Sequence, residues 1–224
     1  MMKIAVLTGA GVSAESGLKT FRDSDGLWEG HDVTKVATPE GFAEDPALVL
    51  EFYNQRRRQL LTVKPNAAHI ALAALEKNHD VTIITQNVDD LHERAGSTKV
   101  IHLHGELLKA RSSKDENLIM EWKKDLNVGD CCENNHQLRP HIVWFGEMVP
   151  MIEVAAEVVA NANVIIIVGT SMQVYPAAGL VQYAQEDAKI YFIDPKPSIS
   201  ETKRIKVFAQ NASTGVPKVV ELLK

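Results

Sequence analysis

Residues 3–17 read KIAVLTGAGVSAESG. Within it, Ile4 to Leu7 form a short apolar run that is typical of a buried strand. Gly9, Gly11 and Ala14 follow it at the spacing G-x-G-x-x-G/A. A tight turn requires glycine, and a pyrophosphate requires bare backbone amides at a helix N-terminus. The stretch therefore predicts a strand followed by a dinucleotide-binding turn, although a purely structural turn can have the same spacing.

Working outward, four more short runs of β-branched residues predict buried strands. They are almost continuously apolar rather than alternating, which favours parallel strands covered on both faces. Helical patterns lie between them, so we expect an α/β fold with a Rossmann-like doubly wound parallel sheet. The predicted strands are 81–84, 100–103, 164–168 and 190–193, and the predicted helices include Ala68, Leu72 and Leu75, then Val154, Val158 and Val159, then a stretch opened by Pro176, and last 216–223.

Two regions interrupt this alternation. Residues 23–64 contain no predicted strand but include a predicted helix over 46–61, and residues 108–140 are polar. We predict one domain over 1–224, with a small helical and loop domain inserted into it. The large part is expected at about 1–28, 65–108 and 140–224, and the insertions at about 29–64 and 109–139.

Composition narrows the class of protein. The chain has 224 residues and a formal net charge of -5, so it gains no general attraction to nucleic acid or anionic lipid. Its two cysteines, Cys131 and Cys132, are too few for a disulfide framework. Met1 to Thr8 lack a signal-peptide pattern, and the run 164–168 is far too short to cross a membrane. We expect a cytoplasmic monomer that binds neither nucleic acid nor membrane.

The continuation of the first turn argues against an ordinary dehydrogenase. Such a fold has an acidic residue about 20 positions further on, at the end of its second strand. Here residues 20–28 form a loop pattern instead.

Polar side chains follow three predicted strands. They occupy 85–92, 102–106 and 169–171. Helix capping by Asn87 or Asp89 would explain one such cluster. Because the carboxyl ends of parallel strands share one sheet edge, three clusters beside the glycine turn predict a ligand site there. His104 is the stronger candidate base, since Gly105 allows close approach and His102 points to the opposite face.

Together these motifs resemble the sirtuin family of NAD-dependent protein deacylases, and the resemblance runs from residue 3 to about 220. It implies a Rossmann sheet beneath a small domain that combines a helical and a zinc-bearing insertion. The motifs are Gly9-Ala10-Gly11-Val12-Ser13, Phe21-Arg22 with Gly26-Leu27-Trp28, Thr85-Gln86-Asn87-Val88-Asp89, His104-Gly105, Phe145-Gly146-Glu147 and Gly169-Thr170-Ser171.

The resemblance implies NAD between the two parts, consumed as a co-substrate. The amides near Gly9 and Gly11 are expected to hold its phosphates. Asp194 stands where the family often has Asn, which leaves the role of that side chain open. The implied NAD-binding residues are Gly9, Ala10, Gly11, Ser13, Ala14, Glu15, Thr20, Phe21, Arg22, Trp28, Gln86, Asn87, Val88, Asp89, Gly169, Thr170, Ser171, Asp194 and Ala212.

The implied reaction is not a hydride transfer. An acyl-lysine oxygen displaces nicotinamide from its ribose, and the products are free lysine, nicotinamide and O-acyl-ADP-ribose. His104 is the implied general base on a ribose hydroxyl, which suits an imidazole that titrates near neutrality. Asn87 and Asp89 are the other implied catalytic residues.

Two further segments concern the acylated protein substrate. Val143, Phe145, Gly146 and Glu147 lie in a stretch expected to pair with an extended peptide by strand addition, although a buried edge strand would explain it too.

The acyl pocket is expected to include Ala37, Tyr53 and Arg56. Tyr53 and Arg56 are three residues apart and share a helix face. Y-x-x-R and Ala37 resemble the sirtuin branch that prefers succinyl, malonyl or glutaryl lysine. Arginine can grip a carboxylate with two hydrogen bonds, so we predict charged acyl groups, with acetyl as the other option. A solvated basic run is the plain alternative.

The family's zinc ligands are largely missing. The first cysteine pair should fall near residues 111–115, where no cysteine occurs, and only Cys131 fits the second pair because Asn134 takes the next place. Cys132 and His136, with Asp115 and Glu116, are the available substitutes. One ligand of four cannot form a closed thiolate site, so we predict no zinc and no other metal ligand.

Other functions remain open at this stage. The same pocket could serve an NAD-consuming ADP-ribosyltransferase, an NAD hydrolase, or a sensor of NAD or ADP-ribose. His104, Asn87 and Asp89 count against a sensor, because binding alone needs no base at the ribose.

Overall fold

The computed structural model describes residues 1–19, 27–28, 30–172 and 175–224, with no side-chain description for Leu27 and Trp28. Within these residues one sheet contains six parallel strands in the order β11-β10-β9-β1-β4-β5. The predicted doubly wound sheet is confirmed. Its strands are β1 (Lys3–Thr8), β4 (Asp80–Thr85), β5 (Val100–His102), β9 (Val164–Val168), β10 (Lys189–Ile193) and β11 (Ile205–Phe208).

The order of the strands determines where a ligand site can lie. From β1 the chain adds β4 and β5 on one side, then returns to add β9, β10 and β11 on the other. Thr8 pairs with Thr85 on one flank and with Val168 on the other. In an open parallel sheet this reversal leaves a crevice beyond the carboxyl ends of the strands, and the turn after β1 lies there.

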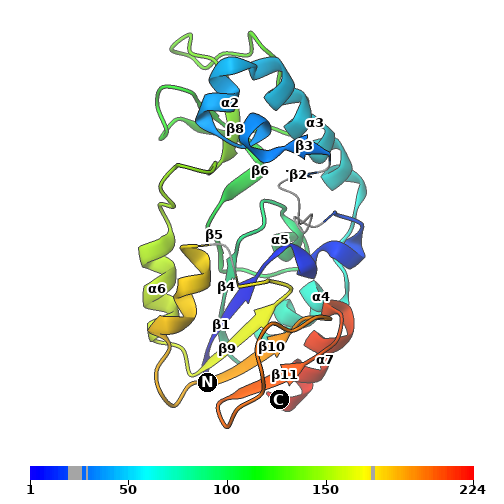
Figure 1. The fold of residues 1–224 in the computed structure, drawn as a ribbon. Coiled ribbons are helices and arrows are strands. Elements are labelled where there is room, and N and C mark those ends of the chain that lie inside the picture. The colour runs from blue at the N-terminus through cyan, green and yellow to red at the C-terminus, as the bar shows by residue number, and fades with distance from the viewer. Residues whose placement is uncertain (20–26, 29, 173–174) are drawn as a thin grey trace.

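Helices cover both faces of the sheet (Figure 1). Ile4 and Val6 point to one face and pack with α4 (Ala67–Leu75) and α7 (Ala212–Leu222). Ala5 and Leu7 point to the other face, toward α6 (Ile152–Ala160) and the 3-10 helix η3 (Ala177–Tyr183). Period-two alternation along a strand buried on both sides explains why its sequence is continuously apolar.

The remaining elements form a second part at the upper end of the molecule in Figure 1. Its longest helix, α3, begins at Pro46 behind an Asp45 cap whose carboxylate accepts from the Leu48 amide. In the described chain an antiparallel sheet in the order β7-β6-β8 lies beside it. The elements of this second part are β2 (Leu27–Trp28), β3 (His31–Asp32), α1 (Val33–Val36), α2 (Pro39–Glu44), α3 (Pro46–Thr62), β6 (Gly105–Ser112), β7 (Ile119–Glu121) and β8 (Leu138–Ile142). Three short helices lie beside the large sheet instead: η1 (Ala10–Val12) and η2 (Ala14–Ser16) follow β1, and α5 (Leu91–Arg94) follows β4.

Several expectations about these elements were wrong. Residues 23–64 do contain strands, the two-residue β2 and β3, which are too short for any periodicity to reveal. The region 108–140, expected as loop, contains β7 and parts of β6 and β8, whose residues include polar side chains such as Lys109, Arg111 and Arg139. The edge strand β11 was also missed, because it has only four residues and includes Lys206. The last helix, α7, begins at Ala212 rather than at residue 216, whereas the helical stretch expected after Pro176 is present as the 3-10 helix η3.

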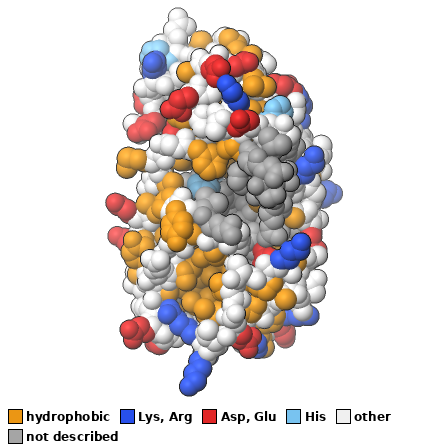
Figure 2. All heavy atoms as spheres, viewed as in Figure 1, with side chains coloured by type: hydrophobic (Ala, Val, Ile, Leu, Met, Phe, Trp, Pro, Cys, Tyr) orange, Lys and Arg blue, Asp and Glu red, His pale blue; other side chains and the backbone are white. Residues whose placement is uncertain are grey.

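The surface in view carries both hydrophobic and charged side chains. On the face in view, hydrophobic side chains gather along its middle, while acidic and basic side chains lie mainly toward its two ends and its margins (Figure 2). No helix in the described ranges is both long enough and apolar enough to cross a membrane.

Candidate functional site

The turn after β1 joins the ends of β1 and β9. Gly9 and Gly11 donate their amides to the carbonyl oxygens of Val168 and Gly169, over 3.1 and 2.8 Å. A Cβ on Gly11 would stand 2.6 Å from the Gly169 Cα, which no backbone tolerates. These glycines therefore allow close approach of two loops. The amides of Gly9 and Gly11 themselves donate within the protein, so the expectation that amides near these glycines hold phosphates stays a prediction that concerns their neighbours in the turn.

A cavity of about 330 Å³ opens at this carboxyl edge and extends under the second part. It brings together residues from the glycine turn, the ends of β4 and β9, the start of β6, the segment after β8, and α3. Of the predicted site residues it is lined by Gly9, Ala10, Gly11, Ser13, Ala37, Tyr53, Arg56, Gln86, Asn87, Val88, Asp89, His104, Val143, Phe145, Gly146, Glu147, Gly169, Thr170 and Ser171.

Other predicted residues lie off this cavity wall. Ala14, Glu15, Asp194 and Ala212 do not line it. Glu15 instead accepts from the amide and hydroxyl of Ser213 at 2.9 and 2.6 Å, and so fixes the start of α7. Asp194 is buried and accepts from the Lys196 amide at 2.8 Å. Their assignment to NAD has no support from the cavity. Thr20, Phe21 and Arg22 lie outside the described residues, as does the side chain of Trp28.

A buried polar network forms the floor of the cavity. The Ser13 hydroxyl donates to Asp89 Oδ2 at 2.9 Å and accepts from Asn87 Nδ2 at 3.1 Å. The Leu91 amide donates to the other Asp89 oxygen at 3.1 Å. Burial raises the pKa of Asp89 to about 6, against those two hydrogen bonds. The carboxylate is thus held charged at neutral pH, close to its titration range.

His69 lies behind this floor, against Ser13 and off the cavity wall, and was not predicted. The Asn66 amide donates to His69 Nδ1 at 3.3 Å, and His69 Nε2 lies 3.4 Å from the Ser13 hydroxyl. Burial lowers the pKa of His69 to about 4, so the ring is neutral and carries its proton on Nε2. The capping pattern Asn66-x-x-His69 was the sequence signal that could have located it.

His104 stands at the cavity wall with a defined tautomer. Its Nδ1–H donates to the Gln86 carbonyl oxygen at 3.0 Å, which leaves Nε2 as the basic nitrogen. Burial lowers the pKa of His104, and the hydrogen bond to Gln86 offsets part of this effect. His104 is therefore a neutral base at physiological pH. His102, as predicted, faces away and contacts Glu93 at 2.7 Å.

The segment after β8 forms the roof. The Val143 amide donates to the His104 carbonyl oxygen at 2.9 Å, and the Phe145 amide donates to that of Ala37 at 3.0 Å. The segment lies outside the named strands, so the alternative of a regular edge strand is wrong. Gly146 has φ of +89°, a left-handed conformation that favours glycine.

Glu147 anchors this roof. Its carboxylate accepts from the Arg139 guanidinium at 2.6 and 3.1 Å, and from the Trp144 amide at 2.8 Å. Arg111 adds a contact at 3.2 Å. Because both carboxylate oxygens of Glu147 accept hydrogen bonds from the protein itself, Glu147 orders the roof. The direct contact with substrate that the sequence led us to expect gains no support from this arrangement.

The far end of the cavity is built by α3. Tyr53 is fully buried, and its hydroxyl accepts from Trp144 Nε1 at 3.0 Å. Burial raises the pKa of Tyr53, so the phenol stays neutral. The Arg56 guanidinium packs over the Phe52 ring at 3.2 Å, and the residue as a whole is only 8% exposed. A buried cation, a phenol and the small Ala37 thus share this wall, which Trp144 and Leu107 also line without having been predicted.

A tetrahedral zinc site does not fit the residues present. Where the resemblance places the first pair of ligands, the Ser112 hydroxyl accepts from the amides of Lys114 and Asp115. The Cys132 thiol donates to that hydroxyl over 3.7 Å, while Cys131 is exposed. Within the described ranges no group of three or more His, Cys, Asp or Glu residues is arranged to hold a metal. That the protein carries no zinc stays a prediction.

The cavity does fit a dinucleotide. Gly11 and Gly169 let the loops after β1 and β9 pack closely at one end of the cavity, which is lined there by small residues. Further along the cavity, the neutral His104 ring and the Asn87 side-chain amide lie near the floor that contains the charged Asp89. A doubly wound sheet, with such a cavity at its carboxyl edge, defines an α/β protein of the nucleotide-binding class. The chain belongs to the Sir2 family, whose family model matches residues 9–176.

Individual relatives support the assignment to the Sir2 family. The chain is 62% identical over 196 residues to an NAD-dependent protein deacylase of Helicobacter pylori (strain ATCC 700392 / 26695), covering 88% of this chain and 86% of the relative. It is 55% identical over 230 residues to an NAD-dependent protein deacylase of Bacteroides thetaiotaomicron, covering 100% and 98%.

Solved structures show the same fold. A Sir2 homolog–NAD complex matches with TM-score 0.87 and 40% identity, covering 99% of this chain and 90% of that one. A Sir2 structure with a deacetylated p53 peptide and 3'-O-acetyl ADP-ribose matches with TM-score 0.79 and 30% identity, covering 98% and 92%.

Proposed function

We propose that this protein is an NAD-dependent protein deacylase that removes acyl groups from lysine, and that it prefers negatively charged acyl groups such as succinyl and malonyl. The observation that carries the deacylase activity is one cavity that joins the glycine turn, His104 and the roof segment 143–147. The acyl preference depends on Arg56, which lies in the wall of that same cavity.

NAD would lie along the carboxyl edge of the sheet. The glycine turn and residues 169–171 accommodate its adenosine and phosphate half, while Gln86, Asn87 and Asp89 face its nicotinamide half. Gln86 is oriented by its hydrogen bond to Thr170 Oγ1 at 3.2 Å. When bound, NAD supplies a scissile nicotinamide–ribose bond and a ribose that accepts the acyl group.

The residues of this chain then have distinct tasks. His104 holds a lone pair on Nε2 and takes a proton from a ribose hydroxyl. The Asp89 carboxylate, fixed by Ser13 and the Leu91 amide, places negative charge beneath a ribose that becomes electron-poor. The roof orients the acyl-lysine peptide and excludes water from the far end of the cavity.

The acyl preference follows from the chemistry of the wall. A planar guanidinium matches a carboxylate with two parallel hydrogen bonds, and a buried site strengthens both. Hydrogen bonds to charged groups are worth ~1.5–3 kcal/mol, which corresponds to about 10- to 100-fold in preference. Ala37 leaves room for a longer acyl chain than acetyl.

One comparison tests the preference. We expect kcat/KM on a succinyl peptide to exceed that on the acetyl version of the same peptide, and Arg56→Met to remove the difference. Arg58→Met is the matched control, since Arg58 lies on the same helix but is exposed and pairs with Asp125 at 2.6 Å. An acetyl preference that Arg56→Met leaves unchanged would refute the acyl assignment.

Nicotinamide release separates the broader alternatives. Release that depends on acylated peptide supports a deacylase. Release without peptide indicates an NAD hydrolase, release with transfer of ADP-ribose to another nucleophile indicates an ADP-ribosyltransferase, and no release indicates a sensor. Mass spectrometry of a mixed acyl-peptide pool after incubation with NAD identifies the preferred acyl group in the same experiment.

A further inference from the structure

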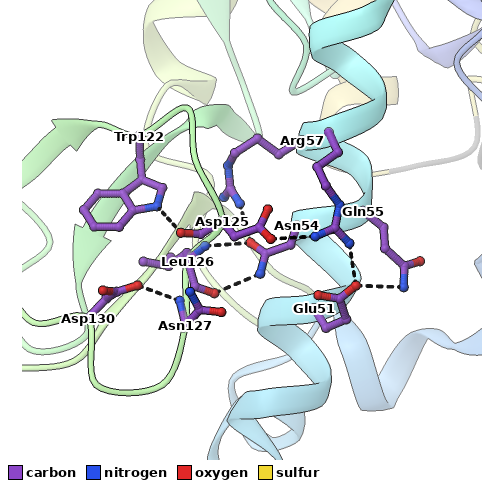
Figure 3. A network of polar contacts seen from close by, with 10 residues as sticks. Glu51, Asn54, Gln55, Arg57, Trp122, Asp125, Leu126, Asn127 and Asp130 are labelled. Carbon is purple, nitrogen blue, oxygen red and sulfur yellow. Dashed lines mark hydrogen bonds and ion pairs between the residues drawn. The ribbon is translucent and has the colours of Figure 1, made fainter.

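The insertion 109–139, where the family resemblance places a zinc site, lies against α3 in this structure and is joined to it by hydrogen bonds. The Asn54 side chain is 2% exposed. Its Nδ2 donates to the Leu126 carbonyl oxygen at 3.0 Å, and its Oδ1 accepts from the Leu126 amide at 2.8 Å. One amide side chain thus satisfies both backbone groups of a single residue, 72 positions away, as a paired strand would (Figure 3).

The same contact is fixed from the helix side. Arg57 Nη1 donates to Asn54 Oδ1 at 2.6 Å, and Arg57 Nε donates to the Leu107 carbonyl oxygen at 3.2 Å. Trp122 Nε1 donates to the Asp125 carbonyl oxygen at 3.1 Å, next to Leu126 (Figure 3). Leu126 is also part of an apolar cluster with Leu50 of α3 and with Cys132 and Leu138 of the insertion.

A second amide closes the loop itself. Gln137 Nε2 donates to the carbonyl oxygens of Asn127, Asp130 and Leu138 at 3.0, 3.1 and 2.9 Å. Gln137 Oε1 accepts from the Gly129 amide at 2.8 Å. A metal would order such a loop by drawing several groups to one point, and here a single side-chain amide contacts four backbone groups.

We propose that Asn54 and Gln137 form a metal-free clamp that holds the insertion 109–139 on α3 and thereby positions Tyr53 and Arg56 at the acyl end of the cavity. Tyr53 precedes Asn54 in the chain and points to the cavity, whereas Asn54 grips the insertion. Opening of the clamp removes the support from the face of α3 that carries Asn54, so the adjoining face with Tyr53, about a quarter turn away, loses its fixed place together with Arg56. Asn54 is a positioning residue, and its catalytic readout rests on the proposed deacylase function.

Limited trypsin digestion tests the clamp without any activity. Lys123 and Lys124 are exposed and immediately precede Asp125 and Leu126. A buried backbone group left unsatisfied raises the population of open forms by about 10- to 100-fold. We expect Asn54→Ala to speed cleavage there, and amide exchange at Leu126, by at least about 10-fold. Asn54→Asp keeps the acceptor but loses the donor to Leu126, and it guards against an Ala variant that fails to fold.

Arg58→Ala is the matched control. It removes a surface ion pair between α3 and Asp125 in which Arg58 is 49% exposed, and such pairs contribute little. We expect cleavage within about 2-fold of wild type. Equal cleavage of the wild type and both Asn54 variants would overturn the clamp. So would about one zinc per purified chain whose removal by EDTA accelerates cleavage.

Kinetics separate positioning from general damage. We expect Asn54→Ala to raise KM for the acylated peptide by about 10-fold while KM for NAD stays near the wild-type value. An unchanged KM for the peptide beside faster cleavage would overturn the positioning role. If the wild type shows no NAD-dependent deacylation, the proposed function fails, and cleavage and amide exchange still decide on the clamp.

Discussion

The Nδ1–H of His104 donates to the carbonyl oxygen of Gln86 across 3.0 Å. Gln86 directly follows β4, and His104 follows β5 and precedes β6. This bond between neighbouring strand ends leaves Nε2 of His104 as the nitrogen that can take a proton.

Replacement of His104 is expected to abolish turnover and leave the fold intact. General base catalysis contributes about 10²- to 10⁴-fold, so His104→Tyr should reduce formation of deacylated peptide by at least that range while the thermal midpoint stays near that of wild type. Liquid chromatography of the peptide product measures the loss. His102→Gln is the control, since His102 faces Glu93 instead. Near-normal nicotinamide release by His104→Tyr in the presence of acylated peptide would count against the assigned role.

The pH profile of the wild type should show an acid limb. His104 must be unprotonated to act as a base, and its pKa lies below the ordinary value because of burial. Asp89 must be ionised, and its pKa is raised to about 6 by burial. Activity should therefore fall as pH drops through about 6 and remain level above 7. A profile of kcat/KM measures this. A limb whose midpoint lies well above 7 would contradict the neutral state of His104.

The approach of β1 to β9 predicts the effect of adding one methyl group. In Gly11→Ala the new Cβ meets the Cα, C and O atoms of Gly169 at 2.6 to 3.0 Å. Overpacking of this kind costs ~1–3 kcal/mol, so the variant should melt earlier and bind NAD more weakly. Gly179→Ala is the control, because its Cβ meets only the Tyr175 ring at 3.7 Å. Calorimetry and NAD titration give the two readouts, and a Gly11→Ala protein equal to wild type in both would disprove the packing argument.

Glu147 should contribute to stability in a pH-dependent way. Burial alone would raise the pKa of Glu147, but hydrogen bonds from Arg139 and the Trp144 amide outweigh it and the pKa is lowered. A lowered carboxyl pKa gives stability that is present above the unfolded value and lost as pH falls through the folded value. Glu147→Gln should lower the free energy of unfolding at pH 7 and flatten its dependence on pH below about 4.5. Denaturant titrations across this range test it, with Glu153→Gln as an exposed control.

Much of this molecule could be read from local sequence. The strands β1, β4, β5, β9 and β10 were predicted because their runs are almost continuously apolar, as expected for strands of a sheet that is covered on both faces. The glycine turn and the polar residues after strands identified one edge of the sheet, because parallel strands all end there. His104 was chosen over His102 by period-two alternation, and their contacts confirm that the two rings face different surroundings.

Tertiary structure decided the rest, because it pairs groups that no local pattern connects. Gly9 and Gly11 follow the expected spacing, yet their amides are used by β9, which lies more than 150 residues further along the chain. Glu147 and Arg139 are eight residues apart in sequence, yet they form one partly buried ion pair that anchors the roof. Asn54 gave no functional signal and His69 gave only a helix-capping signal, since the meaning of a buried polar side chain depends on which partner satisfies it. Sequence determined which residues could act, and long-range hydrogen bonding determined what each of them holds.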